Sequence, residues 1–207
     1  TLSSILLTIV LAIPLGILSA VKHNKWVDYL IRFLSFIGNS MPNFFAAMVL
    51  MYFLSIRLGV LPVVTNTDLG QSIILPTLTL AISMAAKYTR QVRNAVLEEL
   101  RQDYVIGARM RGIKESVILW RHVLPNAMLP IVTLLGLSLG SLLGGTAVVE
   151  IIYNWPGMGS MAIKAIACRD YPMVQAYVLM IAIMYMVINI IVDLSYTYLD
   201  PRIKEVK

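Results

Sequence analysis

The stretch KYTRQVRNAVLEELRQDYVIGARMRGIKESVILWRHVLPNAMLP, residues 87–130, separates two long apolar parts of the chain. Eight of the 17 Lys and Arg residues lie between Lys87 and Arg121. Residues 98–111 have a helix-forming composition, Gly112 interrupts it, and residues 114–122 form a second helical piece. Glycine suits such a joint because it adopts positive φ without a Cβ clash, and Pro125 suits the first turn of the next helix. The stretch therefore predicts two short helices joined at a glycine, lying on a membrane surface.

Composition places the chain among membrane proteins. Of its 207 residues, 58% are hydrophobic and 14% are charged, whereas soluble domains have about 25% charged residues. The net charge of +6 comes from residues in short loops between apolar runs, without the basic patch and interleaved aromatics of a nucleic-acid surface. We therefore expect a lipid bilayer, and no nucleic acid, as a partner. The single cysteine, Cys168, excludes an intrachain disulfide framework and indicates no metal cluster.

Five apolar runs are long enough to cross a bilayer, which requires about 20 mostly apolar residues. They cover residues 2–21, 29–56, 73–96, 127–152 and 173–199. With residues 22–28, 87–126 and the tail from Asp200 on one side, together with Arg32 near its helix end, 14 basic residues lie on that side and 3 on the other. Because basic residues concentrate in cytoplasmic loops, we expect the charged stretch and the C-terminus to be cytoplasmic.

The charged stretch also carries a spaced motif. It includes Tyr104-Val105, Ala108-Arg109, Gly112 and, nine residues later, His122-Val123-Leu124-Pro125. This pattern resembles the cytoplasmic signature loop of ABC-importer permeases, whose general form is Glu-Ala-Ala, three residues, Gly, nine residues, Ile-x-Leu-Pro. Ile106 and Gly107 replace the first two positions and His122 replaces the Ile, departures similar to the peptide/nickel branch. A basic loop alone is common, but the spacing favours coupling to an ATPase.

The resemblance implies a fold and a set of partners. The fold would be all-α, a polytopic membrane bundle with five transmembrane helices and a cytoplasmic coupling helix, the first of a family core of six being absent. Residues 1–199 would form one permease domain, with a coupling loop at about 98–125 and a cytoplasmic tail at 200–207. A second permease subunit, two ATPase subunits and an extracytoplasmic solute-binding protein would complete the importer in the cytoplasmic (inner) membrane. ATP and Mg would be bound by the ATPase, with no cofactor on this chain and no enzymatic activity of its own, and the ATPase would contact Tyr104, Ala108, Arg109, Arg111, Gly112, His122, Leu124 and Pro125.

Further landmarks concern the transported solute. Landmarks of the same branch resemble Ser40-Met41-Pro42-Asn43-Phe44, Glu150, Trp155-Pro156-Gly157 and Arg169-Asp170-Tyr171-Pro172. Of these, the Ser40–Phe44 stretch and the Tyr171-Pro172 ending look closest to nickel-type permeases. Dipeptide, oligopeptide and glutathione permeases share this plan. The expected solute is therefore nickel, free or chelated, with a small peptide as the alternative.

Polar residues within apolar runs are candidates for a solute pathway, since intramembrane polar groups are commonly functional. Asn39, Ser40 and Asn43 fall about one turn apart in the second run, and Glu150 and Asn189 belong to later runs. Helix-to-helix hydrogen bonding is an equal interpretation of the two asparagines. Residues 136, 140 and 144 form a separate face of small residues, Gly136, Gly140 and Gly144. This face favours close approach of two membrane helices, with the second permease subunit as the expected partner.

Two alternatives to an importer permease are a serine hydrolase and an ion-coupled carrier. Gly136-Leu137-Ser138-Leu139-Gly140 matches the G-x-S-x-G pattern of serine hydrolases. That pattern requires a strand–turn–helix elbow, whereas here it lies inside an apolar run, far from His23 and His122. An ion-coupled carrier usually shows internal repeats and midplane polar sites, and we find no convincing repeat. The chain has no phosphate-binding loop and no H-E-x-x-H motif, so energy would come from a partner.

Overall fold

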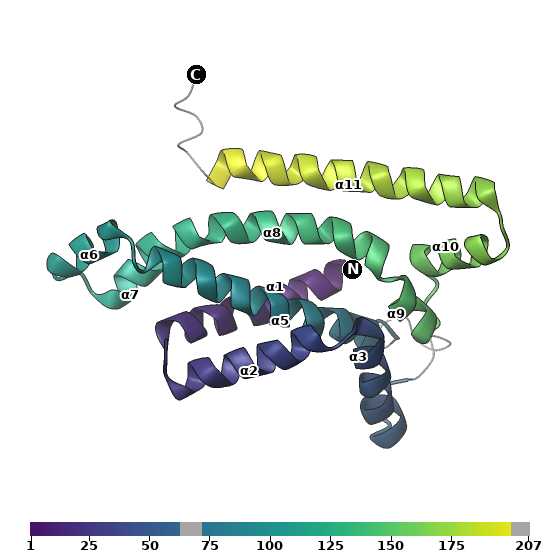
Figure 1. Ribbon diagram of the computed structural model, residues 1–207, viewed down its shortest axis with the longest axis horizontal. Coiled ribbons are helices and arrows are strands. Elements are labelled where there is room, and N and C mark those ends of the chain that lie inside the picture. Colours follow the sequence, from purple (N-terminus) through teal and green to yellow (C-terminus); the bar gives the residue numbers. More distant parts are fainter. Residues whose placement is uncertain (63–71, 200–207) are drawn as a thin grey trace.

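The computed structural model describes residues 1–62 and 72–199, and within them every regular element is a helix (Figure 1). Five long helices, α1 (Leu2–Val21), α2 (Trp26–Ser40), α5 (Ile74–Glu99), α8 (Leu124–Gly145) and α11 (Tyr171–Leu199), form the body. Helix α5 is central and packs against α1, α2 and α8, while α11 packs against α8. The predicted all-α helical bundle is confirmed.

Shorter helices occupy the ends of the body. At one end α6 (Asp103–Met110), α7 (Glu115–Ile118) and the π-helix η2 (Leu119–Val123) follow α5. At the other end lie α9 (Ala147–Ile152) and α10 (Met158–Ala167). Helix α3 (Asn43–Leu50) and the π-helix η1 (Met51–Arg57) project away from the long helices (Figure 1).

The described residues contain three helices long and apolar enough to cross a membrane. They cover residues 2–21, 115–136 and 171–194, and the bent pair α2 and α3–η1 gives a fourth if counted as one span. The expected run at 73–96 does form a single helix, α5, but Lys87, Arg90 and Arg93 lower its apolarity. Five spans therefore remain a prediction from the sequence.

The predicted span over residues 29–56 is not one straight helix. It breaks after Ser40, and the two halves meet at an angle of 103°. Pro42 has no backbone N–H and disfavours a helical conformation for the residue before it. Met41 accordingly has an extended backbone, with φ −83° and ψ 125°, and the helix starts again at Asn43.

The predicted span over residues 127–152 also differs. Helix α8 begins earlier, at Leu124, with Pro125 in its first turn as predicted, and ends at Gly145. Thr146 separates it from α9, which begins at Ala147. The adjacent glycines 144 and 145 explain the end, because glycine is the least favourable non-proline residue inside a helix.

Gly136 allows close packing, but its partner is a helix of the same chain. A Cβ added to Gly136 would lie 2.1 Å from Cγ2 of Val192 in α11, so α8 and α11 can approach only because that side chain is absent. This corrects, for Gly136, the expectation that the small face meets a second subunit. The surroundings of Gly140 and Gly144 lie outside the part of the chain that the structure describes.

Candidate functional site

The charged excursion forms a compact cap beyond the end of α5 (Figure 1). Its first helix is shorter than predicted: residues 98–111 do not form one helix, because α5 ends at Glu99 and α6 begins only at Asp103. Between them Gln102 has an extended backbone, with φ −69° and ψ 150°. The second predicted piece, 114–122, corresponds to α7 and η2.

Apolar side chains hold this cap to the body. Val105 of α6 and Ile118 of α7 are fully buried, in a cluster with Val92 and Val96 of α5 and Ala20 of α1. Burying an aliphatic side chain of this size contributes about 1.5–3 kcal/mol. The cap is therefore packed firmly against α1 and α5.

A polar contact at Tyr104 joins three segments. Its hydroxyl donates to a carboxylate oxygen of Glu99, at 2.6 Å, and accepts from the side-chain amide of Asn126, at 3.3 Å. The backbone oxygen of His122 lies 3.4 Å away. Burial, and then the hydrogen bond to Glu99, raise the pKa of Tyr104, so the hydroxyl keeps its proton as a donor. Tyr104 thus connects the end of α5 to α6 and the start of α8.

Gly112 is the joint between α6 and α7, as predicted. Its φ is +75°, and a Cβ added there would meet no atom within 4 Å. The chain turns at this point through hydrogen bonds from Gly112 N–H to Arg109 O, at 2.9 Å, and from Ile113 N–H to Ala108 O, at 3.2 Å. The glycine is needed here for its backbone conformation, since nothing in this chain crowds the position.

Arg109 has a partner within the cap. Its guanidinium donates to both carboxylate oxygens of Glu115, at 2.7 and 3.2 Å, across the Gly112 turn. This contact raises the pKa of Arg109. Both side chains are well exposed, at 43% and 67%, so the pair contributes about 0–1 kcal/mol. Arg111, the other predicted basic contact, is exposed and caps the end of α6.

Two apolar side chains are exposed on α6, and neither belongs to the predicted coupling residues. Met110 is 84% exposed and Ile106, one turn before it, is 43% exposed. Ala108, expected to contact the ATPase, is partly buried against the cluster around Val105. The i, i+4 spacing of two apolar residues in a charged helix was the available signal, because such residues share one face of a helix.

The remaining motif residues lie where the cap rejoins the body. His122 is an exposed side chain in η2, Leu124 is buried in the same apolar cluster, and Pro125 is exposed in the first turn of α8. They position the return of the chain to α8 and lie beside the Tyr104 contact. The structure therefore brings together Tyr104, His122, Leu124 and Pro125, with Ala108 on the same cluster.

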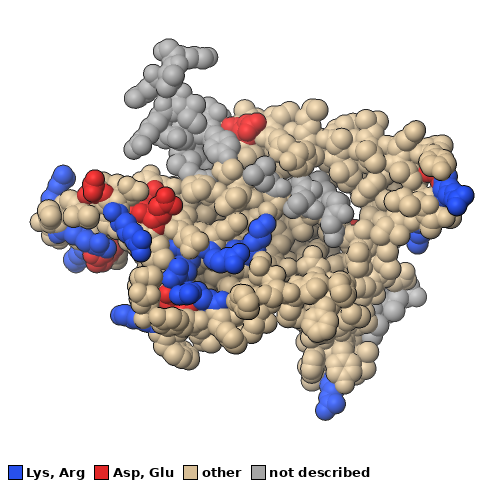
Figure 2. Space-filling view, in the orientation of Figure 1, with Lys and Arg blue, Asp and Glu red and all other residues tan. Residues whose placement is uncertain are grey.

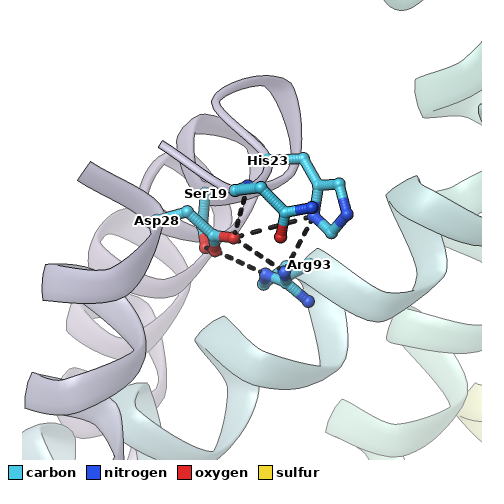
Figure 3. A network of polar contacts seen from close by, with 5 residues as sticks. Ser19, His23, Asp28 and Arg93 are labelled. Carbon is cyan, nitrogen blue, oxygen red and sulfur yellow. Dashed lines mark hydrogen bonds and ion pairs between the residues drawn. The ribbon is translucent and has the colours of Figure 1, made fainter. Parts of the chain in front are cut away.

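A buried ion pair beside the cap was missed from the sequence. Asp28 in the first turn of α2 has a fully buried side chain and receives Nε and Nη2 of Arg93 from α5, at 2.7 and 2.8 Å (Figure 3). Ser19 Oγ and the backbone N–H of Asn24 also donate to it, at 2.6 and 3.0 Å. His23 Nδ1 lies 3.1 Å from Arg93 Nη2. The network fixes the α1–α2 turn against α5 at the base of the cap.

The distribution of charge follows this architecture. Figure 2 shows the Lys and Arg side chains gathered over the end of the molecule that carries α6, α7 and the α1–α2 turn. Of the three basic residues expected on the opposite side, Arg57 ends η1 and Lys164 lies in α10, both remote from the cap (Figure 1). Among residues 1–62 and 72–199, the fold therefore separates the two charge groups that the sequence defined.

The predicted pathway face on the second apolar run is interrupted. Asn39 and Ser40 are exposed at the end of α2, whereas Asn43 is partly buried at the start of α3. The 103° bend lies between them, so these residues do not share one helix face as predicted. Asn189 is partly buried in α11. A pathway role for these residues remains a prediction.

Glu150 has a structural position. Its carboxylate accepts from Thr146 Oγ1, at 2.9 Å, and from the backbone N–H of Ser160 in the first turn of α10, at 2.8 Å. Carboxylates stabilise helix N-termini, where N–H groups lack partners. Gly157 permits this contact, since a Cβ there would lie 2.3 Å from the carboxyl group. Glu150 thus holds α9 and α10 together.

A metal site is not evident in residues 1–62 and 72–199, where no group of three His, Cys, Asp or Glu side chains is placed to hold an ion. What the described residues do provide is a helical membrane domain with an attached cap that presents an apolar pair and several charges.

Comparison with known proteins gives the family. Residues 12–205 match the model of the binding-protein-dependent transport system inner membrane component. The chain belongs to this family, and the resemblance to permeases of ABC importers is confirmed. The fold is similar to a structure described as inward-facing conformations of the MetNI methionine ABC transporter, with a TM-score of 0.73 and 20% identity over 95% of this chain and 89% of that one.

The chain is also similar to proteins with assigned names. It is 41% identical, over 96% of its length, to a protein of Brucella suis biovar 1 (strain 1330) provisionally named a peptide permease protein. It is 38% identical, over 99% of its length, to the glutathione transport system permease protein GsiC of Escherichia coli (strain K12). The chain spans 65% and 66% of the length of these two relatives.

Proposed function

We propose that this protein is the membrane-spanning subunit of an ATP-driven importer, coupled to its ATPase through α6 and the turn at Gly112. The observation that carries the proposal is the signature spacing from Ala108 to Pro125 on a cap that packs against α1, α5 and α8. Membership of the binding-protein-dependent family supports it. Closure of the ATPase subunits would push on the cap, and the apolar cluster would pass that movement to the long helices.

The proposed partners follow from this mechanism. Two ATPase subunits would bind ATP and Mg, a second permease subunit would complete the translocation unit, and a solute-binding protein would deliver the solute on the far side. The chain itself would carry out no covalent chemistry. In this proposal the end with the cap faces the cytoplasm, in agreement with the 14 to 3 distribution of basic residues.

For the solute we propose a small peptide, including glutathione-type peptides. The names of the Brucella and Escherichia relatives favour it. Nickel, free or chelated, is the second candidate, supported by the sequence around Ser40-Met41-Pro42-Asn43-Phe44. The two differ in charge and size, so an uptake assay separates them.

The proposal is tested by uptake into proteoliposomes that contain the full-length permease, its ATPase and its binding protein. We expect labelled dipeptide or glutathione to accumulate only with ATP, and ⁶³Ni²⁺ to remain at the background level. Accumulation of nickel without peptide would reverse the choice of solute. Equal accumulation without ATP, driven by an ion gradient, would contradict the importer class.

Membrane orientation provides a second test, for which the chain offers a natural reporter. Cys168 is exposed at the end of α10, and Lys114 is exposed in the cap. We expect a membrane-impermeant maleimide added to intact spheroplasts to label wild-type Cys168. It should label a Lys114→Cys, Cys168→Ser variant only after the membrane is opened. The reverse pattern would place the cap outside the cell and contradict coupling to an ATPase.

A further inference from the structure

A basic pocket lies between α2 and α5, apart from the residues of the coupling cap. It has a volume of about 610 Å³. Three arginines, Arg32, Arg90 and Arg93, contribute to its wall, together with the aromatic side chains of Tyr29, Phe33 and Phe36. A lining that combines guanidinium groups with aromatic rings suits a ligand with an anionic end and an apolar end.

The charge of the pocket is not balanced within the described residues. Arg93 is neutralised by the bidentate contact with Asp28 (Figure 3). Arg32 and Arg90 are exposed and pair with no carboxylate in the described part of the chain, and the Arg32 guanidinium lies 5.5 Å from the centre of the Tyr29 ring. Two guanidinium groups without a carboxylate partner therefore remain beside the neutralised Arg93, and they favour an oxyanion such as a phosphate.

The residues of α2 indicate how deep in the membrane the pocket lies. Lys22 and Lys25 precede the helix, and Trp26 and Tyr29 at its start are 74% and 56% exposed. Exposed Trp and Tyr next to basic residues are typical of the level of lipid headgroups. One to two turns further, Phe33 and Phe36 are 61% and 67% exposed, as expected for side chains that contact acyl chains. The charged part of the pocket thus lies at headgroup level.

We propose that this pocket binds the phosphate of an anionic phospholipid, with Arg32 and Arg90 as its ligands and the acyl chains along Phe33 and Phe36. Basic pockets between membrane helices are known to hold anionic headgroups. A carboxylate of a dissolved peptide offers the same charge but has no use for the apolar side of the site. The proposal requires only that the chain spans a membrane, so it does not depend on the direction of transport or on the solute.

The test measures lipid retention by native mass spectrometry on the full-length permease purified with its partner subunits. The probes are phosphatidylglycerol and phosphatidylcholine with identical acyl chains. We expect the wild type to retain phosphatidylglycerol preferentially. The double variant Arg32→Gln, Arg90→Gln should lose this preference by about tenfold to thirtyfold, the effect of two basic residues at a membrane surface. Arg93 is left in place because it holds Asp28.

The control variant also removes two positive charges, but at positions outside the pocket. Lys87→Gln, one turn before Arg90 on α5, combined with Arg57→Gln at the end of η1, changes two basic residues that do not line the pocket. It should keep the preference for phosphatidylglycerol. Equal loss in both double variants, or no loss in either, would overturn the proposal. Displacement of the lipid by millimolar inorganic phosphate or acetate would overturn it too, since the site would then need no acyl chain.

Discussion

Replacing Asp28 with alanine is expected to lower the free energy of unfolding by about 3–5 kcal/mol, because it leaves Arg93 with a buried, unpaired charge. The Asp28 side chain is fully buried and that of Arg93 is only 12% exposed. Three further groups depend on the same carboxylate: Ser19 Oγ, the Asn24 N–H, and the α1–α2 turn in which Asn24 has a φ of +57°. Thermal unfolding in detergent, followed by circular dichroism, measures the loss.

The Arg109–Glu115 pair provides a matched control. It has the same closest distance, 2.7 Å, but its side chains are 43% and 67% exposed. Glu115→Ala should therefore cost no more than about 1 kcal/mol. The variant Asp28→Ala, Arg93→Met should recover part of the stability lost in Asp28→Ala, because the unpaired charge is then absent. If Asp28→Ala and Glu115→Ala unfold at the same temperature, the buried network does not hold the bundle together.

Several features of the fold could be predicted from residue types and spacing alone. The apolar runs gave the all-α membrane class, and α1, α5 and α11 begin and end within about three residues of the predicted limits. The need for positive φ at Gly112 was predicted from its place between two helical pieces, and φ is +75°. Local conformational preferences determine these features, so a single sequence is sufficient.

Features that depend on tertiary contacts were not predicted. Residues 29–56 were predicted as one apolar span, yet the helix breaks at Pro42 and divides Asn39 from Asn43. Asp28 and Arg93 are separated by 65 residues, and no local pattern pairs them. The apolar run around Glu150 predicts a pathway candidate but gives no sign of its contact with the N-terminus of α10. In each case the decisive partner comes from a distant segment.

The packing of the cap also depends on tertiary contacts that the sequence did not reveal. Spacing identified Ala108 and Gly112 as coupling residues but gave no indication of which face of α6 is outward. The outward face follows from Val105, which enters the cluster formed by α1, α5 and α8 and brings Ala108 with it. Ile106 and Met110 are left exposed. The proposed contact with an ATPase is therefore expected to centre on these two side chains, with Ala108 in a supporting position.

Replacing Gly112 with valine is expected to uncouple the protein from the ATPase proposed as its partner, while leaving the membrane bundle folded. A β-branched residue at a φ of +75° is strained, at a cost of about 1–3 kcal/mol. An added side chain meets nothing within 4 Å in this chain, so the strain is relieved by turning α6 relative to α7. The Arg109–Glu115 pair spans this turn and would separate, and the Ile106–Met110 face would be misdirected.

Gly59→Val is the control for the effect of backbone strain at a positive φ outside the cap. Gly59 has a φ of +63°, and a Cβ there also meets nothing within 4 Å, but it follows η1, away from the cap. We expect Gly112→Val to weaken ATPase binding by about fivefold to a hundredfold, the equivalent of that strain, and to abolish solute-stimulated ATP hydrolysis. Gly59→Val should retain both. The measurements are ATPase co-purification and hydrolysis in reconstituted complexes of full-length subunits. If Gly112→Val retains both at the level of Gly59→Val, the turn between α6 and α7 does not transmit the movement of the ATPase, and the coupling mechanism must be placed elsewhere in the chain.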